Sequence, residues 1–328
     1  MISKTEVLEA SDEASLRKAS DLLLAGEVVA FPTETVYGLG ANGLDAAAVE
    51  KIFQAKGRPA DNPLILHVPA IEQALPLWQA DDRQVEMARA LADAFWPGPL
   101  SMVLKAAVGV PEITTGGLDS VAVRAPAHPV AQQLLKLCAI PLAAPSANLS
   151  SRPSPTRAAH VAATLSGRIA AIIDGGATDL GIESTVLDLR GEFPRILRPG
   201  SVSQSAIEAV VGRVELAEDD ATAPSPGLRH RHYRPQGVRL QLVDPGEIES
   251  RWQEAVGILC FEETAARLGE RSGPLQLMPD EVGAYGAGLY DALYQLEQGE
   301  SDYYLIEKVP DSTEWKAIAD RLRRAVES

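Results

Sequence analysis

Short apolar runs alternate with amphipathic helical segments along most of the 328-residue chain, and this alternation constrains the fold more than any other feature. The runs at 27–31 and 64–68 are typical of buried strands, and a helix capped by Asp45 extends between them to about residue 55. Such a series predicts an α/β fold with a mixed twisted sheet and flanking helices. Further elements are expected as strands at 100–105, 121–124, 169–173, 184–189 and 195–198, a short strand ending at Pro145, and helices at 82–95, 129–138, 154–166 and 203–211.

The last third of the chain carries a second alternation. This pattern predicts a small Rossmann-like parallel sheet without a glycine-rich phosphate loop, and we expect it to support or regulate the first domain. An acidic run, several prolines and a basic stretch at 217–236 indicate an interdomain linker. We therefore predict a catalytic domain at 1–216, a linker at 217–236 and a C-terminal domain at 237–328. The strands of the C-terminal domain are expected at 238–243, 256–261, 274–278 and 303–307, and its helices at 246–254, 262–269, 282–298 and 312–326.

The formal charge of −15 weighs against a protein whose whole surface binds nucleic acid, although a local basic pocket remains compatible with it. No apolar run approaches the length that crosses a bilayer, and the first residues lack the basic and apolar blocks of a signal peptide. We therefore expect a cytoplasmic protein. Cys138 and Cys260 each lie in an apolar context, which predicts buried, reduced thiols.

Cationic side chains follow several elements in loops that contain Pro or Gly. Lys56 and Arg58 flank Gly57 at the end of a helix, where they suit a phosphate group or simply compensate the helix C-terminus. Arg124 and Arg198 each follow an apolar strand and precede Pro, so we expect both to project from the sheet edge. Four cations at element ends of an acidic chain predict one anionic ligand.

Hydroxyl and amide side chains occur in loops of the same kind. Thr35 follows Glu34 where the first strand has ended, and its hydroxyl either contacts a small polar substrate or bonds its own turn. Ser146 and Asn148 follow the strand that ends at Pro145 and are possible donors to phosphate or carboxylate oxygens. No nucleophile elbow surrounds Ser146, which argues against a covalent serine mechanism. His67, at a strand end, is either a substrate contact or a packed histidine.

Acidic and glycine-rich loops leave two further alternatives open. Asp174 and Glu183 are candidates to hold magnesium through water, or they have turn and strand-start roles. The glycines at 38–43 match G-x-G-x-x-G, so they indicate either a dinucleotide loop or a tight strand-to-helix turn. Asp61, the acid about 20 residues onward, lies in a proline-rich loop, and this weakens the dinucleotide interpretation.

These motifs together resemble the YrdC-domain threonylcarbamoyl-AMP synthases, in the two-domain form with a C-terminal extension. The resemblance covers about residues 12–212, and His232 and Tyr233 with Pro235 resemble the family's linker signature. The motifs occur in the family's order as FPTETVYGLG at 31–40, KGR at 56–58, NPL at 62–64, WPGPL at 96–100, VRAP at 123–126, APSAN at 144–148, RPS at 152–154 and LRPG at 197–200.

The resemblance implies condensation of L-threonine, bicarbonate and ATP to threonylcarbamoyl-AMP and pyrophosphate, with Mg²⁺ bound through the nucleotide phosphates. A tRNA threonylcarbamoyl-transferase system would receive the product and modify the adenosine beside the anticodon, with direct tRNA binding by this chain weak at most. The resemblance implies ATP contacts by Lys56, Arg58, Asn62, Ser120, Ser146, Asn148, Ser154, Arg198 and Tyr233. It implies threonine contacts by Thr35, His67, Arg124, Ala144 and Ser184.

Within that set, Lys56, Arg58, Ser146 and Asn148 would form the catalytic tetrad, and Tyr233 would fold over the nucleotide. A dedicated protein metal site is not expected. The alternative from another class is an RNA-binding module that uses the same cationic cleft, because such a concavity also accepts a phosphate backbone. The acidic net charge weighs against that alternative.

Overall fold

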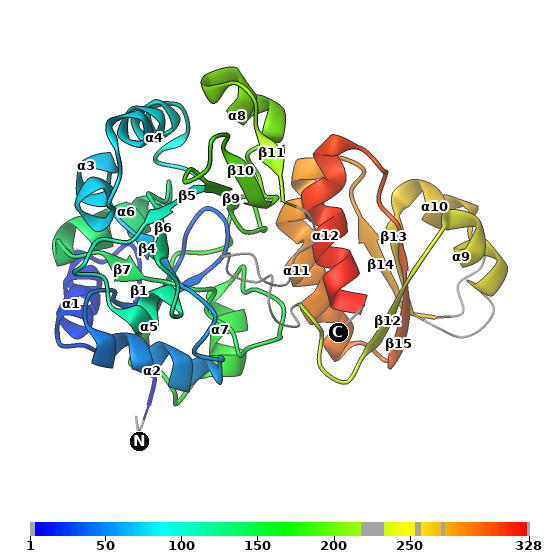
Figure 1. Ribbon diagram of the computed structural model, residues 1–328. Coiled ribbons are helices and arrows are strands. Elements are labelled where there is room, and N and C mark those ends of the chain that lie inside the picture. Colours follow the sequence, from blue (N-terminus) through cyan, green and yellow to red (C-terminus); the bar gives the residue numbers. More distant parts are fainter. Residues whose placement is uncertain (1–3, 218–232, 253–256, 270–272, 327–328) are drawn as a thin grey trace. The chain divides into compact units, whose positions relative to one another are not determined.

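The computed structural model describes residues 4–217, 233–252, 257–269 and 273–326 (Figure 1). These residues form two compact units, the first made of 4–150, 155–179 and 183–217, and the second of 151–154, 180–182 and the described residues from 233 onward. Most of the predicted linker, 218–232, lies outside the described residues, and the domain boundaries at 216 and 237 stay a prediction.

The first unit is built on a mixed sheet, as predicted. The strand pairs include parallel β4–β6 and antiparallel β2–β3, so the sheet joins both kinds of ladder. Its strands, in spatial order, are β1 (Glu6–Glu9), β8 (Ala171–Asp174), β2 (Val29–Phe31), β3 (Gly38–Asn42), β7 (Leu142–Ala143), β4 (Ile65–His67), β6 (Ser120–Arg124), β5 (Leu100–Lys105), β9 (Thr185–Asp188), β10 (Arg195–Arg198) and β11 (Glu215–Leu216).

Helices cover both faces of this sheet because alternate strand residues point to opposite sides. Val28 and Ala30 belong to one core cluster, and Val29 and Phe31 belong to another. The first cluster packs under α2 (Ala46–Lys56), α4 (Asp82–Phe95), α7 (Ala158–Leu165) and α8 (Gln204–Val211), and the second under α1 (Glu13–Leu24) and α6 (Pro129–Cys138). Short helical turns complete the unit at α3 (Ile71–Ala74), η1 (Leu75–Leu77) and α5 (Glu112–Thr115).

The structure corrects the dinucleotide interpretation of the glycines at 38–43 and limits the turn interpretation to Gly43. Gly38–Asn42 is strand β3, which pairs antiparallel with β2, and Gly43 lies in the turn between β3 and the helix that begins at Ala46. A Cβ on Gly40 would meet the ring of Phe31 at 2.8 Å, which explains the glycine by close packing across the strands.

The helix expected to begin at residue 154 is also corrected, because α7 begins only at Ala158. Pro155 precedes the helix, and its carbonyl accepts a hydrogen bond from Tyr37 N at 2.8 Å. Residues 154–156 therefore form a loop rather than the first turn of the helix, and this loop contacts the residue that precedes β3.

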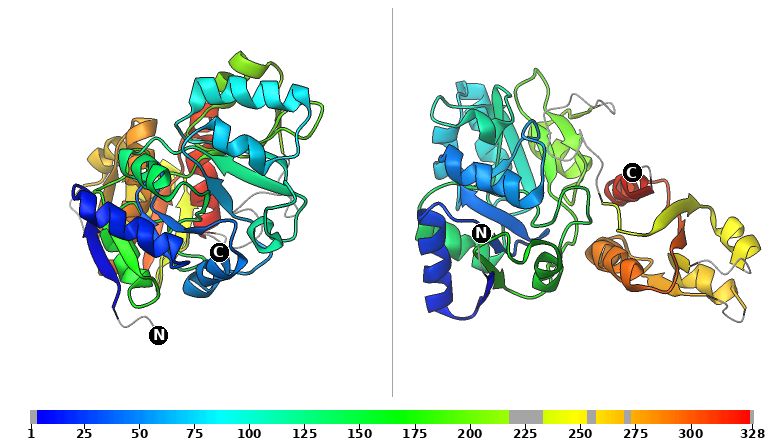
Figure 2. Two further views of the ribbon diagram at one scale, coloured as in Figure 1. Left: turned by 90° about the vertical axis from the view of Figure 1, so that its left-hand side faces the viewer. Right: turned by 90° about the horizontal axis from the view of Figure 1, so that it is seen from below.

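The second unit contains a four-stranded parallel sheet, which confirms the Rossmann-like prediction. The strand order is β12 (Arg239–Val243), β15 (Tyr303–Glu307), β13 (Gly257–Phe261) and β14 (Leu275–Met278). Figures 1 and 2 show α11 (Val282–Gln298) and α12 (Lys316–Val326) on one face, and α9 (Pro245–Arg251) and α10 (Glu262–Arg267) on the other. The turn η3 (Thr313–Trp315) precedes α12.

The segment 180–182 joins this second unit through a glycine contact. Gly181 has φ +69°, and a Cβ there would lie 2.4 Å from the carbonyl oxygen of Gly286 on α11. Residues that are remote along the chain thus contribute to the second unit.

Cys138 and Cys260 are both buried thiols, as predicted. None of the described helices combines the length and apolar character needed to cross a bilayer.

Candidate functional site

The first group of predicted site residues gathers around the end of α2, and we call Lys56, Arg58, Asn62, Ser146 and Asn148 the lysine cluster. Gly57 adopts the left-handed conformation that ends α2. The ammonium of Lys56 donates to the carbonyl oxygens of Ser146 and Asn148, at 2.6 Å each, and lies 3.4 Å from Asn148 Oδ1. Lys56 therefore fixes the loop that carries Ser146 and Asn148.

Lys56 is fully enclosed, and its partners are neutral. Burial is the main cause that holds the pKa of Lys56 well below its usual value, and the nearby Arg58 adds to the effect. The three oxygen partners of the ammonium are two backbone carbonyls and one side-chain amide. The positive charge is therefore compensated by dipoles and not by a carboxylate.

Arg58 and Asn62 lie in the loop after α2. Arg58 Nη2 donates to Pro63 O at 3.1 Å, and its Nε lies 3.4 Å from Asn62 O. Asn62 Oδ1 is buried and has no hydrogen-bond partner within the described part of the chain. A buried acceptor without a donor is unfavourable, so this oxygen marks a position where a ligand donor would be stabilising.

The second group lies at the carboxyl ends of β4 and β6, and we call Glu34, Thr35, His67 and Arg124 the arginine cluster. Arg124 is buried and donates through Nη2 to Glu34 Oε1 at 2.5 Å, through Nη1 to Thr35 Oγ1 at 2.9 Å, and through Nε to Gly98 O at 3.1 Å. The guanidinium is thus held by an ionic partner, a hydroxyl and a carbonyl.

The hydroxyl of Thr35 has a defined direction. Thr33 Oγ1 donates to Val36 O at 2.6 Å, so the 2.8 Å contact between the two threonine hydroxyls requires Thr35 to donate to Thr33. Thr35 Oγ1 then accepts from Arg124. Thr33 therefore bonds its own turn, whereas Thr35 bonds Thr33 and Arg124, and the contact of Thr35 with a substrate stays a prediction.

His67 is a neutral imidazole in this environment. Burial, followed by the charge of Arg124, lowers the pKa of His67 to about 3. Its Nδ1 lies 3.2 Å from Ile65 O, and a carbonyl only accepts, so Nδ1 carries the proton. The histidine therefore adds hydrogen-bonding capacity to the cluster without adding charge.

Two other predicted residues meet at the edge of β9 and β10. Ser184 Oγ contacts Ser101 Oγ at 2.9 Å, and Arg198 Nη2 donates to Ser184 O at 3.0 Å and lies 3.2 Å from Ser184 Oγ. The resemblance implies an ATP contact for Arg198 and a threonine contact for Ser184, and the structure brings these two side chains into contact with each other.

The strand register shows how the arginine cluster is positioned. In the parallel pair β4–β6, His67 is opposite Arg124 and Ile65 is opposite Ala122, so both strands have the arginine cluster at their carboxyl ends. Ser120 begins β6, at the opposite end from Arg124. Ala144, whose backbone N donates to Ile65 O at 3.0 Å, lies between Leu142 on β7 and Ser146. Ser120, a predicted ATP residue, and Arg124, a predicted threonine residue, thus lie at opposite ends of one strand.

Ser154 and Tyr233 belong to the second unit. Ser154 is buried, and Tyr233 has φ +70° and stacks on Tyr290 with ring centroids 5.3 Å apart. Their predicted ATP contacts stay a prediction.

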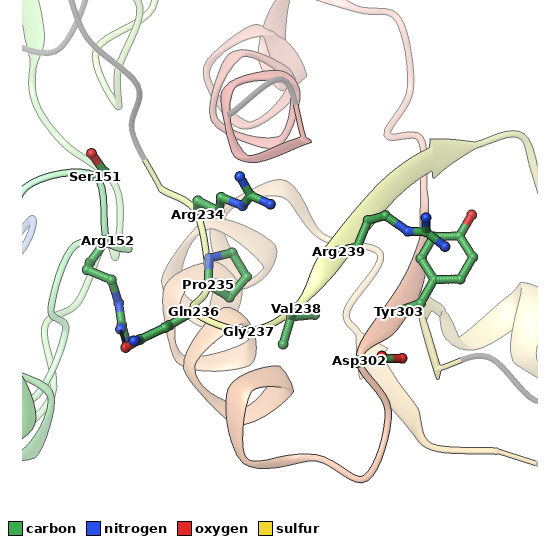
Figure 3. A pocket seen from close by; sticks show the side chains of 10 residues that line it. All are labelled: Ser151, Arg152, Arg234, Pro235, Gln236, Gly237, Val238, Arg239, Asp302 and Tyr303. Carbon is green, nitrogen blue, oxygen red and sulfur yellow. Dashed lines mark hydrogen bonds between the residues drawn. The ribbon is translucent and has the colours of Figure 1, made fainter.

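The second unit also has a hollow with a cavity volume of about 640 Å³ at the amino ends of β12 and β15 (Figure 3). Arg152 is paired with Glu297 and Gln236, and the guanidinium of Arg239 lies 4.2 Å from the ring centroid of Tyr303. The hollow is lined by Ser151, Arg152, Arg234, Pro235, Gln236, Gly237, Val238, Arg239, Asp302 and Tyr303.

The carboxyl edge of the same sheet, where such sheets usually bind ligands, carries Glu307. The carboxylate of Glu307 accepts hydrogen bonds from Phe261 N at 2.9 Å and from Thr264 Oγ1 at 2.8 Å.

Sequence reasoning missed the role of Glu34 as the ionic partner of Arg124. Its carboxylate was noted in the loop, but nothing in the local pattern connects it to a cation 90 residues onward. Asp174 Oδ1 accepts from Gly176 N at 3.0 Å, which agrees with the turn alternative for that acid. Among the described residues, no three His, Cys, Asp or Glu side chains are grouped as a metal site would need.

A family model described as "Telomere recombination" matches residues 21–200, and a model described as "Threonylcarbamoyl-AMP synthase, C-terminal domain" matches residues 202–326. A threonylcarbamoyl-AMP synthase of Pyrococcus abyssi is 43% identical, with 97% of this chain and 96% of that protein covered. The corresponding protein of Bacillus subtilis is 41% identical, with 99% and 98% covered.

A solved structure is similar over the same extent. The crystal structure of P. abyssi Sua5 complexed with L-threonine has a TM-score of 0.90 and 40% sequence identity, and the match covers 98% of this chain and 97% of that one. The similarity therefore includes both compact units.

Proposed function

Because the chain belongs to the threonylcarbamoyl-AMP synthase family, we propose that it condenses L-threonine, bicarbonate and ATP to threonylcarbamoyl-AMP and pyrophosphate. The observation that carries this proposal is that family motif residues 90 positions apart, such as Lys56 and Ser146, meet in a buried cationic cluster. The second cluster, which contains the ion pair of Arg124 and Glu34, is proposed as a separate site for the amino acid.

The reaction has two bond-forming steps. The amine of threonine takes up carbon dioxide, derived from bicarbonate, to form a carbamate. An oxygen of the carbamate then attacks the α-phosphorus of ATP, the bond to the bridging oxygen breaks, and pyrophosphate leaves. Such chemistry needs positioning and charge neutralisation rather than a protein nucleophile.

The lysine cluster fits the nucleotide phosphates. Lys56 holds the loop of Ser146 and Asn148, so that loop and Arg58 are proposed as one preorganised surface for phosphate, and the orphan oxygen of Asn62 would accept from an N–H or O–H group of the nucleotide. Preorganised donors stabilise developing negative charge without reorganisation during the reaction. Ser120, Ser154 and Arg198 are proposed as further ATP contacts.

The arginine cluster fits threonine. Arg124 would bind the carboxylate, while Thr35 Oγ1 and the unprotonated nitrogen of the neutral His67 offer acceptors for the substrate hydroxyl. Ala144 and Ser184 are proposed to complete this pocket.

Magnesium is proposed to accompany ATP. The cationic lysine cluster does not resemble a dedicated magnesium site, since Mg²⁺ prefers oxygen ligands and often uses substrate phosphates. When bound, the ion would neutralise phosphate charge, and the described residues would bind and orient the nucleotide around it.

We propose that the product passes to a tRNA threonylcarbamoyl-transferase system in the cytoplasm. The mixed anhydride is readily hydrolysed, so Tyr233 is proposed to restrict water access by covering the nucleotide. The net charge of −15 favours weak direct tRNA binding at most.

The direct test is pyrophosphate release from magnesium-ATP and bicarbonate, with L-threonine, L-serine or no amino acid. We expect release that depends on threonine and is slower with serine, because serine lacks the methyl group. Protein that is folded by circular dichroism and yet releases no pyrophosphate with threonine would overturn the proposal.

A further inference from the structure

Glu34 has a buried carboxylate with only one of its oxygens engaged. The residue is 5% exposed, and Oε1 accepts from Arg124, whereas Oε2 has no hydrogen-bond partner among the described residues. A carboxylate accepts several hydrogen bonds, and leaving an oxygen buried without a donor is costly. A donor from outside the chain would therefore be strongly favoured at Oε2.

Arg124 complements this acceptor with donors of its own. A guanidinium has five N–H groups, and the described contacts use one on Nε, one on Nη1 and one on Nη2. Two N–H groups thus remain for a ligand beside the orphan oxygen of Glu34. An adjacent cation and anion are complementary to a zwitterion, since one accepts a carboxylate and the other an ammonium.

We propose that Glu34 is the amine-binding carboxylate of the threonine site, an inference that rests on the proposed function. Oε2 accepts a hydrogen bond from the substrate ammonium while Arg124 holds the substrate carboxylate. The pair thereby selects α-amino acids over hydroxy acids that carry a carboxylate alone.

The same contact serves the first chemical step. An ammonium has no lone pair, so the amine must lose a proton before it attacks carbon dioxide. Glu34 accepts that proton, the nitrogen lone pair forms the new C–N bond, and one C=O electron pair moves to oxygen. A second proton leaves the nitrogen to water, and the carbamate results. Glu34 later returns its proton to solvent.

Other charged groups near Glu34 are relevant to any pH dependence. Arg124 contacts it from β6, and the charge of Glu34 acts on His128, which caps α6. Asp179 also acts on His128, and His67 responds to Arg124. A pH profile therefore needs a variant that changes Glu34 alone.

The competing role for Glu34 is that of a counter-ion that only orients Arg124. Glu34→Gln keeps the shape and one oxygen acceptor but removes the charge. Calorimetric titration of this variant and of the wild type would use three ligands: L-threonine, 3-hydroxybutanoate, which lacks the amine, and threoninol, which lacks the carboxylate. Glu307→Gln, a change of another buried glutamate in the second unit, is the matched control.

We expect Glu34→Gln to bind threonine and threoninol roughly 10- to 100-fold more weakly, with 3-hydroxybutanoate unchanged or tighter. Equal weakening of threonine and 3-hydroxybutanoate would overturn the proposal in favour of the counter-ion role. Absence of threonine binding and of pyrophosphate release in the wild type would instead overturn the proposed function.

Two further readouts address the proton transfer and any failure to fold. Pyrophosphate release by Glu34→Gln should recover toward the wild-type rate as pH rises, because solvent then deprotonates the amine, and Glu34→Asp should restore part of the activity at neutral pH. A loss independent of pH would contradict the proton role. If Glu34→Gln does not fold, the affinities of the wild type test the proposal instead. The wild type should bind threonine at least tenfold more tightly than 3-hydroxybutanoate. Equal affinities for the two ligands would overturn the proposal.

Discussion

The lysine cluster and the arginine cluster are both built around a buried cation, but they balance its charge differently. Lys56 donates to two neutral carbonyl oxygens, whereas Arg124 contacts the carboxylate of Glu34. The hydrogen bonds of the Lys56 ammonium thus go to dipoles alone, whereas Arg124 is matched by an anion. These balances match the two substrates, since ATP is a polyanion and threonine is a zwitterion.

Each cluster also contains one buried side-chain oxygen that has no hydrogen-bond partner among the described residues, and these two oxygens differ in charge. Asn62 Oδ1 is neutral, whereas Glu34 Oε2 belongs to a charged carboxylate. The comparison therefore predicts that the clusters respond differently to loss of a single partner.

The largest expected effect is on activity in the lysine cluster. Lys56→Ala and Arg58→Ala should each reduce threonine-dependent pyrophosphate release by at least about a thousandfold, because each removes charge that stabilises the transferring phosphate. Lys51→Ala is the control, since Lys51 lies on the same helix but pairs with Glu27 at the surface. Full turnover in either variant would contradict the proposed role of the lysine cluster in binding phosphate.

A large effect on stability is expected when the ionic pair of the arginine cluster is broken. Arg124→Gln leaves Glu34 as a buried charge without its cation, so the free energy of unfolding should fall by about 3–5 kcal/mol. The double variant Arg124→Gln/Glu34→Gln should regain much of this loss, because no charge is then stranded. Urea unfolding of the four proteins forms the double-mutant cycle, and additive losses would contradict the pairing.

An intermediate effect should follow from the neutral His67. Its pKa is about 3 in the folded state against a usual value of 6.5, so the unfolded state binds the proton first as pH falls. The stability that depends on this group is present above about pH 6.5 and is lost progressively toward pH 3, with a slope of at most about 1.4 kcal/mol per pH unit. His67→Gln should flatten the dependence of unfolding free energy on pH in this window. An unchanged slope would show that His67 is already solvated in the folded protein.

The smallest effect on stability is expected at Asn62. Asn62→Leu removes a buried acceptor without a partner, so the free energy of unfolding should change by less than about 1 kcal/mol. The affinity for ATP should nevertheless fall, because the ligand loses an acceptor. A large loss of stability with unchanged ATP affinity would indicate a structural role instead.

The sequence predicted most of the fold because the apolar periodicity is local. The helix at 82–95 and the parallel sheet of the second unit have the predicted bounds or nearly so. Strand β3 was not predicted because its glycines are typical of a loop. The glycines are explained by close packing against the ring of Phe31 on the neighbouring strand. Packing of this kind cannot be read from the segment itself.

The candidate site was predicted in part for the same reason. Ordered motifs marked Lys56 and Arg124, but neither cation reveals its partner in the local sequence. The carboxylate of Glu34 and the carbonyl oxygens near Ser146 reach these cations only through the sheet topology. The charge balance that separates the two clusters is therefore a property of the folded chain.

The salt dependence of ligand binding tests this charge balance most directly. Calorimetric titrations of the wild type with magnesium-ATP and with L-threonine would be made at low and at high ionic strength. Screening weakens the attraction of a polyanion to a net positive site far more than the docking of a zwitterion onto a neutral pair. We predict that the affinity for ATP falls steeply with salt while that for threonine changes little. Equal losses for both ligands, or a steeper loss for threonine, would contradict the account.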